Sequence, residues 1–190
     1  MDECGFNFEH FLLSKVLGER SVNARVSGGR QNTTIVACAS ACGRVLPPFV
    51  IIKGKMRKAL NAYQTKDNPL GSVFSWQAKA WMEDDLAPKW FESIFLKYID
   101  ASRPQVLILD QHHSHEYFDF LHLAREHITV IDLPPHTTHW LQPLDKGCFS
   151  SLSSNYHAAA TEFMCAEKSN VVTKSTFLSI FATAWRSSMT

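Results

Sequence analysis

The sequence predicts an α/β fold in which helices cover a mixed β-sheet. Short apolar runs bounded by turn residues, typical of strands, alternate along the chain with longer stretches whose apolar residues recur at helical spacing. The composition agrees with this, because 45% of the 190 residues are hydrophobic and 13 Phe and 5 Trp supply bulky core material. A chain of this length can bury one sizeable core.

The first predicted strands form a hairpin. Residues 33–41 begin with β-branched side chains and end at a turn signal, and residues 47–54 form a second apolar run that opens with two prolines and closes with glycine. We expect the two strands to pair around the turn at Cys42, Gly43 and Arg44.

The remaining elements alternate between helix and strand. Residues 75–86 are predicted to be a helix with Ser75 as its N-cap. A second helix carries an apolar stripe from Trp90 to Ile99 that would pack on the sheet. Residues 105–109 form a continuous apolar run, which is typical of a strand buried on both faces. The other expected elements are a strand at 128–133 and helices at 115–127, 144–167 and 175–186.

Charge and targeting signals narrow the class of protein. There are 19 Lys and Arg against 18 Asp and Glu, and a formal charge of +1 argues against a generic basic DNA-binding protein. This near-zero charge is still compatible with an enzyme that acts on DNA through a local site. The apolar runs are too short to span a membrane, and no secretory signal is expected. Five cysteines without a CxxC pair indicate a reduced intracellular compartment.

Three acidic residues stand out by their positions. Asp110 directly follows the predicted strand at 105–109. Asp145 lies at the start of a predicted helix, with 34 residues between it and Asp110, and Asp2 lies near the chain start. Each could simply occupy a turn or cap a helix. Carboxylates that converge at a sheet edge would instead bind Mg²⁺ or Mn²⁺, and two such ions can promote phosphodiester cleavage.

Four segments carry a resemblance to a known family. Residues 1–6, 46–55, 107–110 with the following Ser114 and His115, and 133–145 resemble the DDE superfamily endonuclease domain. The closest resemblance is to the pogo, Tigger and jerky group of transposases, which also includes centromere protein B. The resemblance runs from Met1 to about Phe149, and its most specific part is the segment 134–145.

The resemblance implies a ribonuclease-H-like fold, with an incomplete catalytic domain at 1–150 and helices at 151–190 that pack on it or extend from it. Asp2, Asp110 and Asp145 would be the catalytic acids and would hold two Mg²⁺ (or Mn²⁺) ions for DNA cleavage and strand transfer. DNA would be the partner, in the nucleus, with a possible homo-oligomer, no membrane and no small-molecule cofactor. The alternative is a domesticated, catalytically silent nuclear module that binds DNA or protein.

The sequence also departs from the family pattern. The family places its first acid at the end of a central strand, whereas only Met1 precedes Asp2 here. We therefore expect a domain truncated at its N-terminus, with most of its first strand missing, Asp2 on a frayed end and little or no activity, because catalysis needs carboxylates held within ~0.5 Å. Gln111 replaces the usual Asn. Lys146 follows the third acid, where it could offset metal binding or contact a phosphate.

Three further features have alternative interpretations. The dense basic run of Lys53, Lys55, Arg57 and Lys58 is either a solvated loop or a phosphate contact. A zinc site would use the histidines, but no cysteine pair supports it. Helix-face aromatic residues are predicted to be core rather than base-stacking platforms. The histidines are His112, His113, His115, His136 and His139, and the aromatic residues are Trp76, Trp81, Trp90, Phe91 and Phe95.

Overall fold

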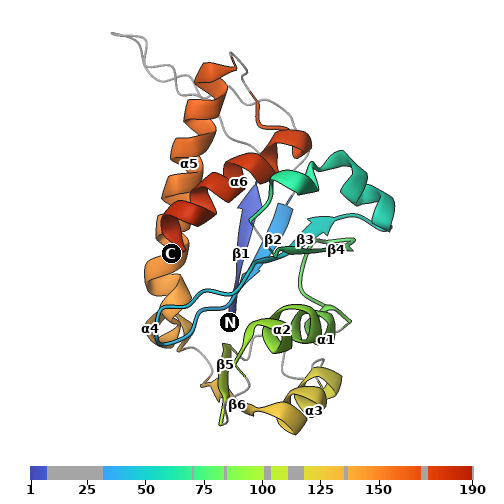
Figure 1. The fold of residues 1–190 in the computed structure, drawn as a ribbon, viewed down its shortest axis with the longest axis vertical. Helices are drawn as coiled ribbons and strands as arrows, with labels where there is room; N and C mark the ends of the chain where they lie inside the picture. The colour runs from blue at the N-terminus through green and yellow to red at the C-terminus, as the bar shows by residue number, and fades with distance from the viewer. Residues whose placement is uncertain are drawn as a thin grey trace.

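The computed structural model describes residues 1–7, 32–69, 71–83, 85–100, 104–110, 118–134, 137–167 and 171–189. These residues form a four-stranded sheet of order β1-β2-β3-β4, a separate pair β5-β6, and helices around both (Figure 1). The predicted mixed α/β class is confirmed.

The strands combine antiparallel and parallel pairing. In the main sheet β1 pairs antiparallel with β2, β2 pairs antiparallel with β3, and β4 runs parallel to β3. The second sheet is a parallel pair. The strands are β1 (Asp2–Asn7), β2 (Asn32–Ala37), β3 (Phe49–Lys53), β4 (Val73–Gln77), β5 (Val106–Asp110) and β6 (Thr129–Leu133).

The helices agree with most of the predicted pattern. One helical run joins α1 (Leu86–Trp90), the π-helical stretch η3 (Phe91–Phe95) and α2 (Leu96–Tyr98). The others are the 3-10 helices η1 (Arg57–Ala62) and η2 (Thr65–Asp67), α3 (Phe118–His127), α4 (Thr138–Leu141), the π-helical stretch η4 (Leu144–Cys148), α5 (Phe149–Ala166) and α6 (Lys174–Ser188).

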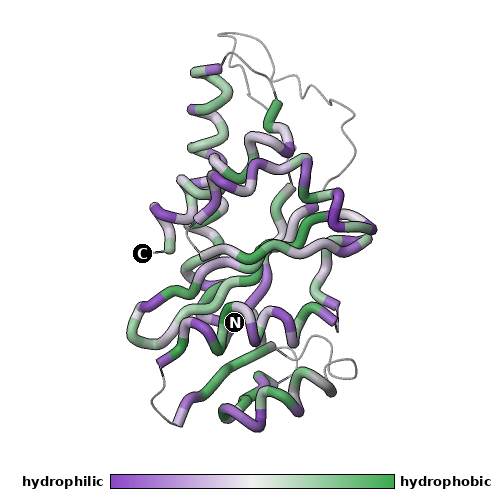
Figure 2. Tube along the Cα trace, turned by 45° about the vertical axis from the view of Figure 1, so that its right-hand side comes forward, coloured by the Kyte–Doolittle hydropathy of each residue, from purple (hydrophilic) through white to green (hydrophobic). Residues whose placement is uncertain are grey.

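The main sheet lies between two helical layers. Successive side chains of a strand point to opposite faces, so Ile35 and Val50 pack against α5 and α6 whereas Val36 and Ile51 pack against α1 and η3. Figure 1 shows α5 and α6 along one face and α1 with α2 beyond the other. Apolar residues concentrate along the strands between these layers (Figure 2).

An aromatic cluster fixes β1 to the layer of α5 and α6. The Phe6 ring lies 5.2 Å from that of Tyr156 and 5.7 Å from that of Phe181, in edge-on contacts. Such pairs add to the stabilisation that burial already gives. Because Asp2, Cys4 and Phe6 alternate onto one face of β1, this cluster also sets the position of the Asp2 side chain.

The prediction that most of the first strand is missing is wrong. Six residues from Asp2 onward form β1, in register with β2 from Asp2 opposite Ala37 to Asn7 opposite Asn32. Asp2 therefore begins a paired strand and does not lie on a frayed end. The strand forms because the free edge of β2 satisfies its backbone hydrogen bonds.

The predicted helix at 75–86 is also wrong. Ser75 is the buried middle residue of β4, opposite Ile51 of β3, and the helix begins only at Leu86. Residues 73, 74 and 76 are Val, Phe and Trp, which favour a strand, and pairing with β3 overrides the local helical signal.

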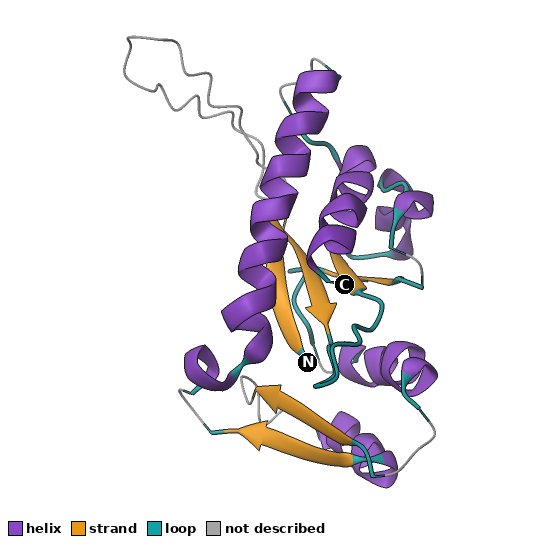
Figure 3. Ribbon diagram, turned by 60° about the vertical axis from the view of Figure 1, so that its left-hand side comes forward, coloured by secondary structure: helices purple, strands orange, loops and turns teal. Residues whose placement is uncertain are grey.

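The parallel pair β5-β6 lies apart from the main sheet (Figure 3). Leu107 and Leu109 are buried against α1 and α3, whereas Val106 is 50% and Ile108 is 46% exposed. The prediction of a strand buried on both faces is therefore wrong, because the helices that the structure describes cover only one face of β5. The amine of Met1 donates to the carbonyl of Ile108 at 3.0 Å and joins this pair to the start of β1.

Candidate active site

Two of the three predicted acids lie together. Asp2 begins β1, and Asp145 is the exposed second residue of η4. Burial is the largest cause that raises the pKa of Asp2 to about 6, and the negative charge of Asp145 raises it further. The structure thus places the two carboxylates close enough to repel each other.

The Asp2 carboxyl has one satisfied oxygen and one unsatisfied oxygen. The backbone amide of Glu3 donates to Oδ1 at 2.7 Å and lowers the pKa of Asp2. Oδ2 is shielded from solvent and has no hydrogen-bond partner among the described residues. A buried acceptor without a partner is unfavourable by roughly 1–3 kcal/mol.

Gln142 links the two parts of this site. Its side chain is 2% exposed, and its Nε2 donates to the carbonyl of Met1 at 3.2 Å. The Gln142 amide also lowers the pKa of Asp2. This buried hydrogen bond therefore connects the residue two positions before η4 to the start of β1. Asp145 belongs to η4 and Asp2 to β1, so the bond connects the neighbourhoods of the two acids. Gln142 was not predicted from the sequence, where the available signal was a polar side chain between Leu141 and Pro143.

Cys4 lies on the same face of β1 as Asp2. Burial, and then the charges of Asp2 and Asp145, raise the pKa of the Cys4 thiol to about 11. The thiol is therefore neutral at physiological pH in the metal-free protein.

For Asp110, the structure describes the position of the backbone only. Asp110 ends β5, the strand whose Ile108 carbonyl accepts from the Met1 amine, so this strand lies beside the start of β1. The side chain of Asp110 lies outside the described residues. The same is true of Gln111 and of the histidines of the zinc hypothesis, namely His112, His113, His115, His136 and the side chain of His139.

The donor chemistry fits a hard divalent cation. Two carboxylates converge, and one of them holds a shielded oxygen without a partner; Mg²⁺ and Mn²⁺ prefer oxygen ligands. Among the described residues alone, no group of three His, Cys, Asp or Glu side chains is arranged to hold a metal. The described part of the site is therefore a pair of acids.

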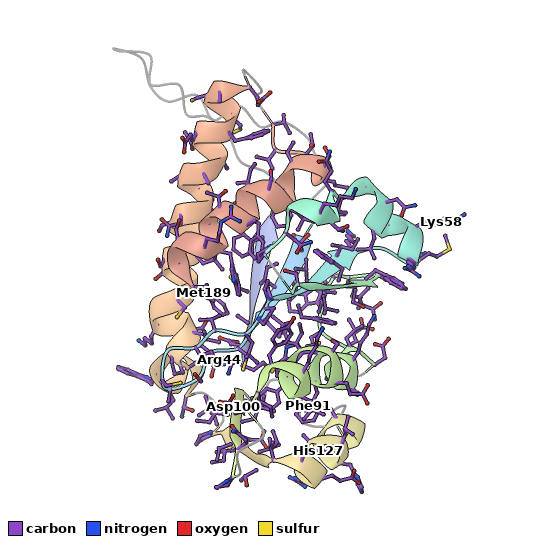
Figure 4. The ribbon with its side chains drawn as sticks, in the orientation of Figure 1. Arg44, Lys58, Phe91, Asp100, His127 and Met189 are labelled. Atoms are coloured by element: carbon purple, nitrogen blue, oxygen red, sulfur yellow. The ribbon has the colours of Figure 1, made fainter. Side chains whose placement is uncertain are left out.

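The basic run lies elsewhere on the sheet. Lys53, Lys55, Arg57 and Lys58 are all exposed, at the end of β3 and the start of η1. The strand registers put the end of β3 level with the end of β1, two strands away, so Lys53 is about 20 Å from Asp2. Lys58 projects from the right-hand side of the molecule in the view of Figure 4.

A close approach shapes the turn within this basic run. A Cβ atom on Gly54 would lie closer to the Cβ of Ala59 than carbon atoms approach. The amide of Gly54 also donates to the carbonyl of Gln77 at 2.9 Å, which fixes the turn to the end of β4. Lys53 and Lys55 are therefore held on a defined turn.

The prediction that the aromatic residues are part of the core is confirmed for some of them and wrong for others. Trp90, Phe91 and Phe95 are buried as predicted, but Trp81 is 58% exposed. Trp140 in α4, which the sequence did not single out as a site residue, is 71% exposed. The Nζ of Lys146 lies 5.2 Å from the centre of its ring.

These features define a protein of mixed α/β fold in which the carboxyls of Asp2 and Asp145 lie near each other. The chain matches the family model of the DDE superfamily endonuclease over residues 30–190 and belongs to that family. Asp110 and Asp145 lie inside the matched range, and Asp2 precedes it.

The chain is also similar to individual curated proteins. The whole chain is 30% identical, over 205 aligned residues, to a protein of Cochliobolus lunatus named MFS-type transporter clz9. The chain spans 22% of the length of that relative, so most of the relative lies outside the comparison. No solved structure matches the chain. Among the described residues, none of the helices combines the length and apolar character needed to cross a membrane.

Proposed function

We propose that this DDE superfamily endonuclease domain is transposase-derived and cleaves DNA phosphodiesters with a divalent metal. Asp2, Asp145 and Asp110 would hold Mg²⁺ or Mn²⁺. The observation that carries the proposal is that the charge of Asp145 acts on the Asp2 carboxyl, whose Oδ2 is shielded and has no hydrogen-bond partner among the described residues. A cation there would relieve both the repulsion and the missing hydrogen bond.

Each residue of the site has a defined task in this proposal. Bound metal would stabilise the charge that develops on the phosphate oxygens and activate the attacking water. Asp2 is mostly ionised at neutral pH, because its pKa is about 6, so its oxygens are available as ligands. Gln142 holds the start of β1 through the carbonyl of Met1, and Cys4 stays neutral beside the acids.

The arrangement of layers supports a ribonuclease-H-like fold. An antiparallel run from β1 to β3 is covered on both faces by helices, and the Met1 amine joins the parallel pair β5-β6 to β1. The domain was expected to be inactive because Asp2 would lie on a frayed end of the chain, where its carboxylate is not held in position. Because β1 is paired with β2 along its length, we propose that the site is competent for cleavage.

The finer assignments rest on the resemblance of residues 133–145. We propose kinship with the pogo, Tigger and jerky transposases and centromere protein B, a nuclear location, and assembly into homo-oligomers. Two metal ions per site would fit a third ligand from Asp110.

A second candidate function is a catalytically silent DNA-binding module. The exposed basic run about 20 Å from the acids favours it, because these charges can attract phosphates without any contribution from Asp2 or Asp145. In that case DNA binding would survive loss of the acids, and no cleavage would occur.

Nicking of supercoiled plasmid DNA by the full chain with Mn²⁺ separates the two functions. We expect nicking by the wild-type chain and its loss in Asp2→Asn, Asp110→Asn and Asp145→Asn. Glu92→Gln, which removes an exposed acid elsewhere on the surface, is the matched control and should nick normally. Binding without nicking by the wild-type chain would support the silent module.

A further inference from the structure

Exposed cations gather where the parallel strands β3 and β4 end. The register pairs Lys53, the last residue of β3, with Gln77, the last residue of β4. Because the two strands are parallel, the segments that follow them leave the sheet at the same edge. Each of these segments carries exposed basic residues. The β3-β4 basic surface consists of Lys53, Lys55, Arg57, Lys58 and Lys79.

One carbonyl group holds the two segments together. The carbonyl of Gln77 accepts from the amide of Gly54 at 2.9 Å and from the amide of Ala80 at 3.1 Å. Gly54 lies in the turn that carries Lys55, and Ala80 closes the turn that carries Lys79. The basic run after β3 and the lysine after β4 are therefore fixed relative to each other.

The turn that carries Lys79 contains a strained residue. Among the residues that the structure describes, Ala80 is the one non-glycine with a positive φ, at 59°, where its Cβ is crowded by the backbone. Ala80 is fully buried, and its carbonyl accepts from the Thr34 hydroxyl at 2.5 Å. Strain of this kind persists where surrounding contacts impose it, and it is frequent at functional sites. These contacts give the exposed Lys79 a defined position.

The cations of this surface are not neutralised by neighbouring acids. None of the five forms an ion pair among the residues that the structure describes, whereas Arg44 pairs with Asp100 at 3.2 Å. The stretch 32–66 contains no Asp or Glu at all. Glu83, an acid near the end of β4, accepts from the side-chain amide of Gln77 and not from a lysine. The surface is therefore positively charged and available to an anionic partner.

The charge of this surface suits a row of phosphates. Phosphates follow one another closely along a DNA strand, so several neighbouring cations can each neutralise one of them. An anionic membrane is the other candidate, because Met56 is 64% and Trp81 is 58% exposed. Two separate apolar side chains do not make the broad apolar face that lies in a membrane surface, and the chain belongs to an endonuclease superfamily. These observations favour DNA.

We propose that the β3-β4 basic surface binds the sugar-phosphate backbone of duplex DNA, and that Lys79 belongs to the same contact as the basic run. A duplex carries twice as many phosphates per unit length as a single strand, which favours it for a purely cationic contact. Phosphate contacts read no bases, so binding is independent of DNA sequence. The choice of DNA rests on the proposed endonuclease function, whereas the contact itself makes no use of the acids.

The test measures binding of a fluorescent duplex of about 12 base pairs to the full chain, by anisotropy at several salt concentrations in EDTA. Lys79→Gln should weaken binding about 5-fold near 0.1 M salt and make the salt dependence shallower by about 1 charge. Lys79→Arg, which keeps the charge, should bind normally. Lys97→Gln removes an exposed lysine that lies over the Tyr98 ring and is the matched control, with wild-type binding expected.

Stoichiometry tests whether the two turns form one surface. We expect one short duplex per chain, and in the triple variant Lys55→Gln, Lys58→Gln, Lys79→Gln we expect a salt dependence shallower by about 3 charges. Two duplexes per chain, of which Lys79→Gln removes only one, would overturn the proposal of a single contact. Thermal unfolding should show that the variants are folded, since all three side chains are exposed.

Wild-type affinity and salt dependence in Lys79→Gln would overturn the proposal, as would an equal loss in Lys97→Gln. Binding to phosphatidylserine vesicles that requires Lys79, without duplex binding that requires it, would also overturn it and would assign the surface to a membrane. Plasmid nicking by the wild-type chain together with unchanged duplex binding in Lys79→Gln would overturn this inference alone. Duplex binding that requires Lys79 in a chain that never nicks DNA would support this inference and contradict the endonuclease function.

Discussion

At the scale of single residues, the state of the Asp2 carboxyl determines what the site can do. One oxygen accepts a backbone hydrogen bond from Glu3, and the other is shielded without a partner close to Asp145. In the metal-free protein, folding therefore destabilises the ionised form of the Asp2 carboxyl relative to its protonated form. A site of this kind is stabilised by any cation that enters it.

This environment gives the metal-free protein a specific pH dependence. The pKa of Asp2 rises from 3.8 to about 6 on folding, so the folded chain binds more protons than the unfolded chain between these values. Its stability should then fall as pH rises from about 4 to about 6. Asp2→Asn should stabilise the chain by about 1–2 kcal/mol above pH 6 and have little effect at pH 4.

Urea unfolding at pH 4 and pH 7.5, in EDTA, measures this difference. Asp100→Asn is the control, because Asp100 is exposed and its ion pair with Arg44 lies on the surface. An Asp2→Asn effect of equal size at both pH values would contradict the electrostatic explanation.

Gln142 should matter through the hydrogen bond to Met1. Gln142→Leu keeps a side chain of similar size but leaves the Met1 carbonyl without this donor, so we expect a loss of about 1–3 kcal/mol in unfolding free energy. Gln64→Leu, at an exposed position, should change stability by less than about 0.5 kcal/mol. Equal effects of the two substitutions would show that the buried amide has no structural role.

At the scale of elements, the position of Asp2 depends on how β1 is anchored. Phe6 packs among Tyr156, Phe177 and Phe181 of α5 and α6. Because Phe6 and Asp2 share one face of a single short strand, a shift of the ring displaces the carboxylate as well.

Substitution of the anchor should therefore impair the metal site as well as the core. Phe6→Leu should reduce stability by about 1 kcal/mol and should also weaken Mn²⁺ binding. Phe91→Leu removes a buried ring from the opposite layer, and should reduce stability similarly while leaving Mn²⁺ affinity unchanged. Urea unfolding and calorimetric titration measure the two effects, and equal Mn²⁺ affinities would contradict the coupling.

The elements also show how far sequence reasoning reaches. The hairpin of β2 and β3 and the helices α3, α5 and α6 follow from local patterns of turn residues and apolar spacing. The strand β4 was predicted as a helix, because its identity depends on pairing with β3. The exposed face of β5 was missed because an apolar run does not reveal which face the helices cover.

The same limit applies to the site. Asp2 and Asp145 were identified by resemblance, and their proximity depends on the fold. Gln142 and Trp140 lie in the segment quoted for that resemblance, yet one is buried and the other exposed. Burial of a glutamine and exposure of a tryptophan oppose the usual preferences of both residues, so composition and spacing predict the reverse.

At the scale of the whole molecule, the acids and the basic run occupy opposite ends of one sheet. About 20 Å corresponds to several base pairs, so one DNA duplex could contact both regions. The near-zero net charge of the chain is compatible with DNA binding of this localised kind.

The combined variant Lys55→Gln with Lys58→Gln should therefore weaken duplex binding and make its dependence on salt shallower by about 2 charges. Its Mn²⁺ affinity should be unchanged, because both lysines are far from the acids. Lys97→Gln removes an exposed lysine beside Tyr98 and should leave the salt dependence as it is. Binding isotherms at several salt concentrations test this, and identical slopes would contradict a phosphate contact.

The most direct test of the metal site is calorimetric titration of the full chain with Mn²⁺ at pH 7.5. We predict saturable binding to the wild-type chain, at least 10-fold weaker binding to Asp2→Asn and to Asp145→Asn, and normal binding to Glu92→Gln. Wild-type affinity in both aspartate variants, or no binding to a folded wild-type chain, would contradict the assignment of Asp2 and Asp145 as a divalent metal site.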